Sequence, residues 1–210
     1  MSNDEFIGHP YTDLYPSVWG LWAFAESHSV LPNHTTLLGF PDGMGFYYSS
    51  PIKGWAASIL LPIIGLLNTW NVLLIAARIA TPLCAFGAAR AWGLGRNGSA
   101  AAAILYGCSP FFHGYAVEGI VEGTDGWTLA LWLWCLGAKR FRLASLPFGL
   151  TILSSWYLGM VACLLLGIAA LWDKRSAWSA VGLGLAIPAL YQFMQAFPET
   201  EPLDATIRAG

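Results

Sequence analysis

The first stretch of the chain that could do chemistry is GHPYTDLYP, residues 8–16, in which His9 and Asp13 lie four residues apart. Two prolines bracket Asp13, and proline limits the backbone that holds the carboxylate. One hypothesis makes Asp13 a general base or a metal ligand that faces a cavity, with His9 beside it to bind substrate. The other makes Asp13 the cap of a helix that starts near Ser17.

The second such stretch is SPFFHGYAVEGIVEGTDGW, residues 109–127, which carries one histidine and three acids between glycines. Glu118 and Glu122 are four residues apart, so on a helical turn they would share one face and repel each other unless a cation, a proton or a substrate joined them. We predict catalytic roles for both acids and substrate binding by His113. A solvated acidic loop is the alternative.

The same stretch also offers the only cofactor site that the sequence indicates. Three acids and a histidine within thirteen residues suit a hard divalent metal with oxygen ligands, such as Mg²⁺ or Mn²⁺. Asp125 is the predicted ligand, together with Asp13 and Glu122.

Arg78, Tyr47 and Tyr48 are further candidates for ligand binding. Arg78 lies well inside an apolar run, and an arginine at membrane depth marks a cavity or an ion pair. It either anchors a lipid phosphate, which suits guanidinium geometry, or pairs with an acid or with backbone carbonyls freed near Pro82. The two tyrosines lie in a turn-rich loop, where they either stack on a sugar or sit in the aromatic belt of a membrane.

The composition indicates that a membrane surrounds the elements that position these residues. Of 210 residues, 56% are hydrophobic and only 10% are charged, whereas charged residues make up roughly a quarter of a soluble domain. The net charge of −2 excludes a basic nucleic-acid-binding surface. All four cysteines lie in apolar runs without a CxxC motif, so neither a zinc site nor a disulfide framework is indicated.

The apolar runs predict an all-α, polytopic transmembrane protein. The expected spans lie near residues 69–93, 98–113, 124–138 and 176–197. Bases fill alternate gaps between the apolar runs, namely Arg90, Arg96, Lys139, Arg140, Arg142, Lys174 and Arg175. Acids fill the other gaps. The positive-inside rule therefore places the basic gaps in the cytoplasm and the acidic gaps outside.

Three segments are not expected to cross the membrane as simple helices. Residues 143–172 contain a polar break at Ser154 and Ser155, which favours a re-entrant hairpin of two half-helices over one long tilted helix. Residues 54–67 suit an interfacial or partly inserted helix that ends at Asn68. The tryptophan-rich residues 17–27 suit a helix at the level of the lipid headgroups.

We therefore expect a single membrane domain. Residues 1–53 form an external loop with an interfacial helix, residues 54–197 form the transmembrane helices, and residues 198–210 form an external tail. An external amino terminus that begins at once with a structured segment implies a missing first span, so we expect the chain to be truncated at both ends. The predicted location is multi-pass in the plasma membrane or bacterial inner membrane.

In order and pattern, these pieces resemble the amino-terminal part of a GT-C superfamily membrane glycosyltransferase. The resemblance covers about residues 6–195. It is carried by GHPYTDLYP, the tryptophan-rich helix, the PDG loop followed by SSPIKGW, and the acidic stretch 113–125. It implies transfer of a hexosyl or pentosyl group from a polyprenyl-phosphate sugar donor to an unknown acceptor, on the external face of the lipid bilayer.

The resemblance also implies roles for particular residues. Asp13 would take the place of the first-loop carboxylate that activates the acceptor. Glu118, Glu122 or Asp125 would correspond to second-loop acids that assist it or hold a metal. Arg78 matches no fixed motif of the family, so its phosphate role depends on membrane physics alone.

Two other classes of function fit the same composition. A transporter or flippase for a lipid or small solute would use the re-entrant hairpin and Arg78 to line its path, although no convincing repeat relates the two halves of the chain. A non-catalytic membrane subunit would use its many small residues to pack against partner helices.

Overall fold

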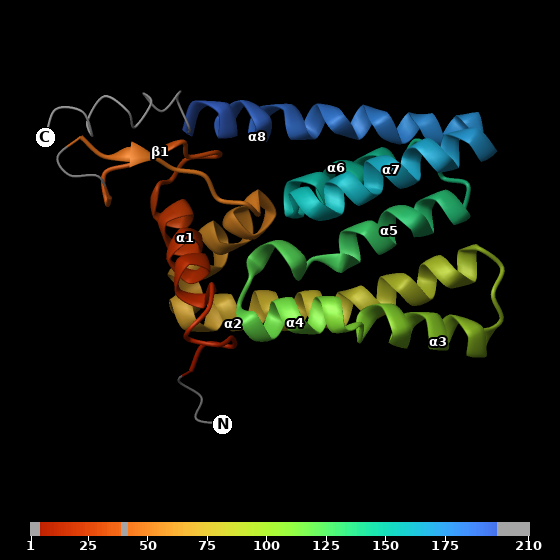
Figure 1. Cartoon of the computed structure of the whole chain (residues 1–210), viewed down its shortest axis with the longest axis horizontal. Helices are drawn as coiled ribbons and strands as arrows, with labels where there is room; N and C mark the ends of the chain where they lie inside the picture. Colours follow the sequence, from red (N-terminus) through yellow and green to blue (C-terminus); the bar gives the residue numbers. More distant parts are fainter. Residues whose placement is uncertain (1–4, 39–41, 197–210) are drawn as a thin grey trace, which may run out of the picture.

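Apolar helices lie side by side along one direction, and one further helix crosses their ends (Figure 1). The computed structural model describes residues 5–38 and 42–196. The lengthwise helices are α2 (Pro51–Ala91), α3 (Arg96–Gly107), α4 (Pro110–Glu118), α5 (Gly126–Gly137), α6 (Ser145–Ser154), α7 (Trp156–Trp172) and α8 (Leu183–Ala196). The crossing helix is α1 (Leu14–Glu26). The prediction of an all-α fold is confirmed.

The remaining elements are short. The 3₁₀ turn η1 (Val121–Gly123) precedes α5, and the 3₁₀ segment η2 (Lys174–Gly182) leads into α8. Strands β1 (His34–Thr35) and β2 (Met44–Gly45) pair antiparallel in the loop before α2. The predicted helix over 176–197 is therefore regular α-helix only from Leu183 onward, and the predicted tail 198–210 lies outside the described residues.

Helix α1 packs into one of two hydrophobic cores. Leu21 and Phe24 are fully buried, and they pack with Trp70 and Leu74 of α2. The helix predicted over 17–27 is thus present but starts at Leu14. Since most of its length is covered by protein, it is more than a surface helix held by its tryptophans.

Helix α2 consists of two helices joined at a kink. Gly65 has φ 76° and ψ 167°, which lie outside the helical region and which glycine adopts readily. The chain therefore turns between a first segment that packs on α1 and a second that runs the length of the molecule. The separate helix expected over 54–67 is confirmed, with its end at Gly65 instead of Asn68.

The segment 143–172 is broken as expected. Ser155 has extended backbone angles, φ −167° and ψ 127°, between α6 and α7, and its side-chain oxygen accepts a hydrogen bond from the Leu158 N–H at 3.3 Å. Gly159 of α7 lies against Ile152 of α6, because a Cβ on Gly159 would meet the Ile152 Cα at 3.1 Å. The chain therefore folds back on itself, and the alternative of one long helix is wrong.

The segment predicted as one span over 98–113 consists of two helices. Helix α3 ends at Gly107, and α4 begins at Pro110. The residue before a proline avoids helical angles, and Ser109 accordingly has φ −57° and ψ 146° and caps α4 by accepting a hydrogen bond from the Phe112 N–H. Helix α4 thus occupies much of the stretch that was expected to be an acidic loop.

The two ends of the molecule differ in charge. The connections α2–α3, α5–α6 and α7–α8 lie at the same end (Figure 1), and they or the adjoining turns carry the seven bases assigned to cytoplasmic gaps. Helix α1 and the turn between α4 and α5, with the acids of these segments, lie at the opposite end. Two helical stretches, Pro51–Ala91 and Lys174–Gln195, are long and apolar enough to cross a membrane.

Helix α6 meets the start of α8 through two glycines. A Cβ on Gly182 would lie 2.9 Å from the Gly149 nitrogen, and a Cβ on Gly149 would lie 2.6 Å from the Gly182 carbonyl oxygen. Backbone atoms cannot move aside as a flexible side chain can, so both positions require glycine.

We therefore expect Gly182→Ala to destabilise the protein by about 1–3 kcal/mol, the usual cost of an overpacked contact. The matched control is Gly184→Ala, because a Cβ at Gly184 meets no atom within 4 Å. Thermal unfolding of the purified protein in detergent, followed by circular dichroism, would measure both. Equal unfolding midpoints for the two variants would contradict the contact.

Candidate functional site

A buried ion pair joins the amino-terminal ends of α2 and α5. Lys53 stands in the first turn of α2, Asp125 directly precedes α5, and the Lys53 Nζ lies 2.9 Å from the Asp125 Oδ2. Their side chains are only 5% and 4% exposed. Removing two charges from water is costly, so such a pair persists only when further hydrogen bonds satisfy both groups.

Those further hydrogen bonds are present. The Lys53 ammonium also donates to the Val121 carbonyl oxygen at 3.1 Å and to the Thr124 hydroxyl, so all three of its protons have acceptors. The other Asp125 oxygen, Oδ1, accepts from the Trp127 indole N–H at 3.2 Å. Lys53 thereby fixes η1 and the start of α5 against α2.

A cavity of about 280 Å³ opens beside this ion pair. Lys53, Asp125 and Trp127 contribute the polar part of its lining, and alanines and leucine of α2 contribute much of the rest. The cavity is therefore an apolar recess with one ion pair in its wall.

The predicted metal site does not form among the described residues. They contain no group of three or more His, Cys, Asp or Glu side chains placed to hold a metal ion. Asp125, the predicted ligand, is paired with Lys53, whose ammonium supplies the positive charge that a metal would have supplied. Asp13 is exposed while Asp125 is buried. The interpretation of Asp13, Glu122 and Asp125 as one ligand set is corrected accordingly.

Glu118 and Glu122 do not share a helical face. Helix α4 ends at Glu118 because Gly119 adopts left-handed angles, φ 71° and ψ 21°. Glu122 follows in the separate turn η1. The predicted pair of repelling carboxylates is therefore wrong. The charge of Glu122 instead helps to raise the pKa of Tyr47 and Tyr48 in the loop before α2.

Tyr47 and Tyr48 lie close to the acids. Burial, opposed by a hydrogen bond from the Trp156 indole and reinforced by the charge of Glu122, raises the pKa of Tyr47 to about 12. Burial, together with the charges of Glu122 and Asp125, raises the pKa of Tyr48 well above its ordinary value. Both phenols are therefore neutral hydrogen-bonding groups near pH 7.

The two tyrosines differ in access. The Tyr47 ring is half-buried and packs edge-on against Phe193, with ring centroids 5.1 Å apart. The Tyr48 ring is 4% exposed and lies against Gly20 and Phe24 of α1. Tyr48 thus presents no ring face on which a sugar could stack. Its buried hydroxyl has no hydrogen-bond partner within the described parts of the chain.

The loop that carries Asp13 packs on the turn that follows α4. The Thr12 hydroxyl donates to the Glu118 carbonyl oxygen, and a Cβ on Gly119 would meet the Leu14 Cα at 2.8 Å. Asp13 occupies the cap position of α1, but its side chain makes no capping hydrogen bond, so the predicted capping role is not observed. The exposed Asp13 carboxylate and the segment of Glu118 thus lie in one region.

His9, His113 and Arg78 are more scattered. His9 is exposed beside Tyr11, with ring centroids 5.6 Å apart. His113 is exposed on α4. Arg78 is half-buried on α2, and its buried Nη1 has no hydrogen-bond partner in the described structure. The predicted pairing of Arg78 with an acid is not observed there.

Sequence reasoning missed Lys53. One signal could have singled out Lys53, because it is the only lysine or arginine before Arg78 and lies two residues after Pro51 at the start of an apolar helix.

Comparisons with family models, with curated proteins and with solved structures found no match for the chain.

We expect Lys53→Met to lower the free energy of unfolding by about 3–5 kcal/mol, because it leaves the Asp125 carboxylate buried without an opposite charge. The double variant Lys53→Met with Asp125→Asn removes both charges and should recover a large part of that loss. Chemical unfolding in detergent of the wild type, both single variants and the double variant gives the coupling energy. Additive effects of the two substitutions would show that the pair does not stabilise the fold.

Proposed function

We propose that the chain is a multi-pass membrane protein whose basic end faces the cytoplasm. Three observations support this placement. Two helical stretches are long and apolar enough to span a bilayer. Large apolar side chains such as Ile79, Leu164 and Ile187 are exposed on the lengthwise helices, as expected where lipid is the solvent. The basic turns collect at one end, as the positive-inside rule requires.

The placement predicts a defined pattern of accessibility. In a variant without the native cysteines, we expect a cysteine introduced at the exposed Ser29 to react with a membrane-impermeant maleimide in intact cells. A cysteine at the exposed Asn97 should react only after the cells are broken. The opposite pattern would reverse the orientation, and labelling of both sites in intact cells would contradict the membrane placement.

We infer further that the acidic end carries the active site of a membrane glycosyltransferase that uses a polyprenyl-phosphate sugar. The observation that supports this most is the contact between the Asp13 loop and the turn after Glu118, which brings two acid-bearing segments together although they lie 106 residues apart. Asp13 is exposed and free of capping bonds, so it is available to accept a proton from an acceptor hydroxyl.

Other side chains suit supporting roles. Glu122 and the neutral phenol of Tyr47 can orient a polar substrate by hydrogen bonds. Arg78, with its unpartnered nitrogen at membrane depth, suits the phosphate of the lipid-linked donor. Lys53 and Asp125 are assigned to the architecture of the site, because every proton of the ammonium is already used within the protein.

Transport of a lipid or small solute is the second candidate, and the helix break at Ser155 favours it. Ser154 and Ser155 are fully buried, and the Ser154 hydroxyl lies 3.2 Å from that of Thr128. Discontinuous helices are typical of transporter binding sites. Movement of labelled lipid across vesicles that contain the protein, without loss of sugar from a donor, would favour transport over transfer.

The glycosyltransferase proposal predicts the effect of Asp13→Asn. In membranes that contain the chain, transfer from labelled polyprenyl-phosphate hexoses or pentoses should fall by about 10²–10⁴-fold, the usual contribution of a general base. Glu26→Gln is the matched control, because Glu26 is an exposed acid at the other end of the same helix. Release of polyprenyl phosphate would be measured. An unchanged rate would refute the role of Asp13, and failure of the wild type to use any donor would refute the transferase.

A further inference from the structure

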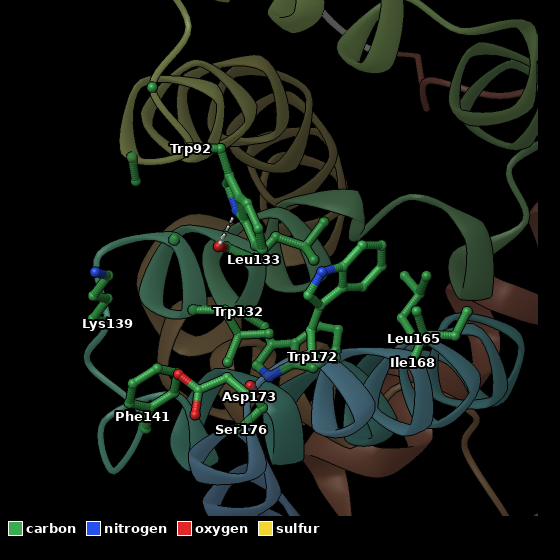
Figure 2. A pocket seen from close by; sticks show the side chains of 15 residues that line it. Trp92, Trp132, Leu133, Lys139, Phe141, Leu165, Ile168, Trp172, Asp173 and Ser176 are labelled. Carbon is green, nitrogen blue, oxygen red and sulfur yellow. Dashed lines mark hydrogen bonds between the residues drawn. The ribbon is translucent and has the colours of Figure 1, made fainter.

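The basic end of the molecule contains an open apolar cavity of about 610 Å³. Its lining comes from all three turns at that end and from the facing sides of α5 and α7, including Trp92, Leu136, Phe141, Leu165 and Ile168. Figure 2 shows Trp92 reaching toward α5, where its indole N–H donates to the Leu133 carbonyl oxygen at 3.0 Å. The volume falls within the range of roughly 300–1,000 Å³ that ligand sites occupy.

A second hollow, of about 400 Å³, adjoins the first and is basic. The two share Lys139 and Phe141, and the second is also lined by Arg140, Arg142 and Arg175. The hollow thus places a cluster of positive charge at the mouth of an apolar recess.

Most of this positive charge has no negative partner. Arg175 is paired with Asp173, with 2.8 Å between the Arg175 Nη2 and the Asp173 Oδ2. Lys139, Arg140 and Arg142 form no ion pair within residues 5–38 and 42–196. Arg142 instead lies over the Trp178 ring, with its Cζ 5.4 Å from the ring centroid.

We propose that these two hollows together bind an anionic phospholipid of the cytoplasmic leaflet. An acyl chain occupies the apolar cavity, and the phosphate lies against Lys139, Arg140 and Arg142. The charge complementarity is direct, because guanidinium groups contact phosphate oxygens through two hydrogen bonds at once. Basic pockets between transmembrane helices on this side of a membrane suit such headgroups.

Trp172 indicates the depth at which this site lies in the membrane. Its indole lies at the rim of the apolar cavity and is 87% exposed. Tryptophan favours the level of the headgroups, so the rim lies where a lipid phosphate would lie. The inference depends on the membrane placement proposed above, and it is independent of glycosyl transfer.

Native mass spectrometry of the full chain in detergent, with added phosphatidylglycerol or phosphatidylcholine, tests the site. We expect the wild type to prefer phosphatidylglycerol. We expect Arg140→Gln with Arg142→Gln to bind it about thirtyfold more weakly, because each base near a membrane surface contributes roughly fivefold. The control is Arg96→Gln with Lys174→Gln, which removes the same charge from the same end but from residues that line neither hollow.

A second arm tests the acyl chain. Ala169→Phe places a ring in the apolar cavity and should weaken binding of phosphatidylglycerol, and glycerol 3-phosphate alone should not bind. Should the double arginine variant fail to fold, Arg140→Gln alone replaces it, since its side chain is exposed, with an expected loss of about fivefold.

Equal binding of the two lipids, or equal losses in the test and control variants, would overturn the proposal. So would binding of glycerol 3-phosphate as tight as that of the lipid. Because binding is measured in micelles, its outcome is independent of the orientation in cells and of the activity of Asp13.

Discussion

The ion pair between Lys53 and Asp125 is the interaction on which the acidic end of the molecule depends. A buried charge is stable only when its partner and its hydrogen bonds are all in place, and here they come from α2, η1 and the start of α5. Fixing η1 also fixes Val121, which belongs to the core around α1. The position of α1, and of the Asp13 loop that precedes it, therefore follows from a pair of charges that is almost entirely buried.

The need to satisfy buried polar groups also explains where the helices stop. A break inside apolar surroundings leaves backbone groups without helical partners, and these groups must be satisfied locally. At Ser155 and Ser109 the side-chain oxygen accepts a hydrogen bond from the first turn of the next helix. At Gly65 the break has φ 76° and ψ 167°, angles that glycine adopts readily. Each interruption of the apolar helices therefore has a residue that makes it possible.

These features differ in how far sequence alone could predict them. The separation of acids from bases and the break at Ser154–Ser155 were predictable, because sparse charges and local polarity are visible along the chain. The pairing of Asp125 with Lys53 was not, since a contact over 72 residues depends on how α2 and α5 pack. The shared face of Glu118 and Glu122 was predicted from spacing alone, which overlooked that Gly119 would end the helix. Asp13 was placed correctly on a loop at the start of a helix, but its approach to Glu118 is a tertiary contact.

The contacts of the amino-terminal segment also determine the order in which the parts of the protein can fold. The Ile7 N–H donates to the Asn71 side chain, and the Thr12 hydroxyl reaches Glu118, 106 residues later. At a synthesis rate of roughly 5–20 residues per second, Glu118 is added about 5–20 seconds after Thr12. Helix α1 is thus made well before one of its partners and can complete its packing only later, so its apolar side must be shielded from other chains in the meantime.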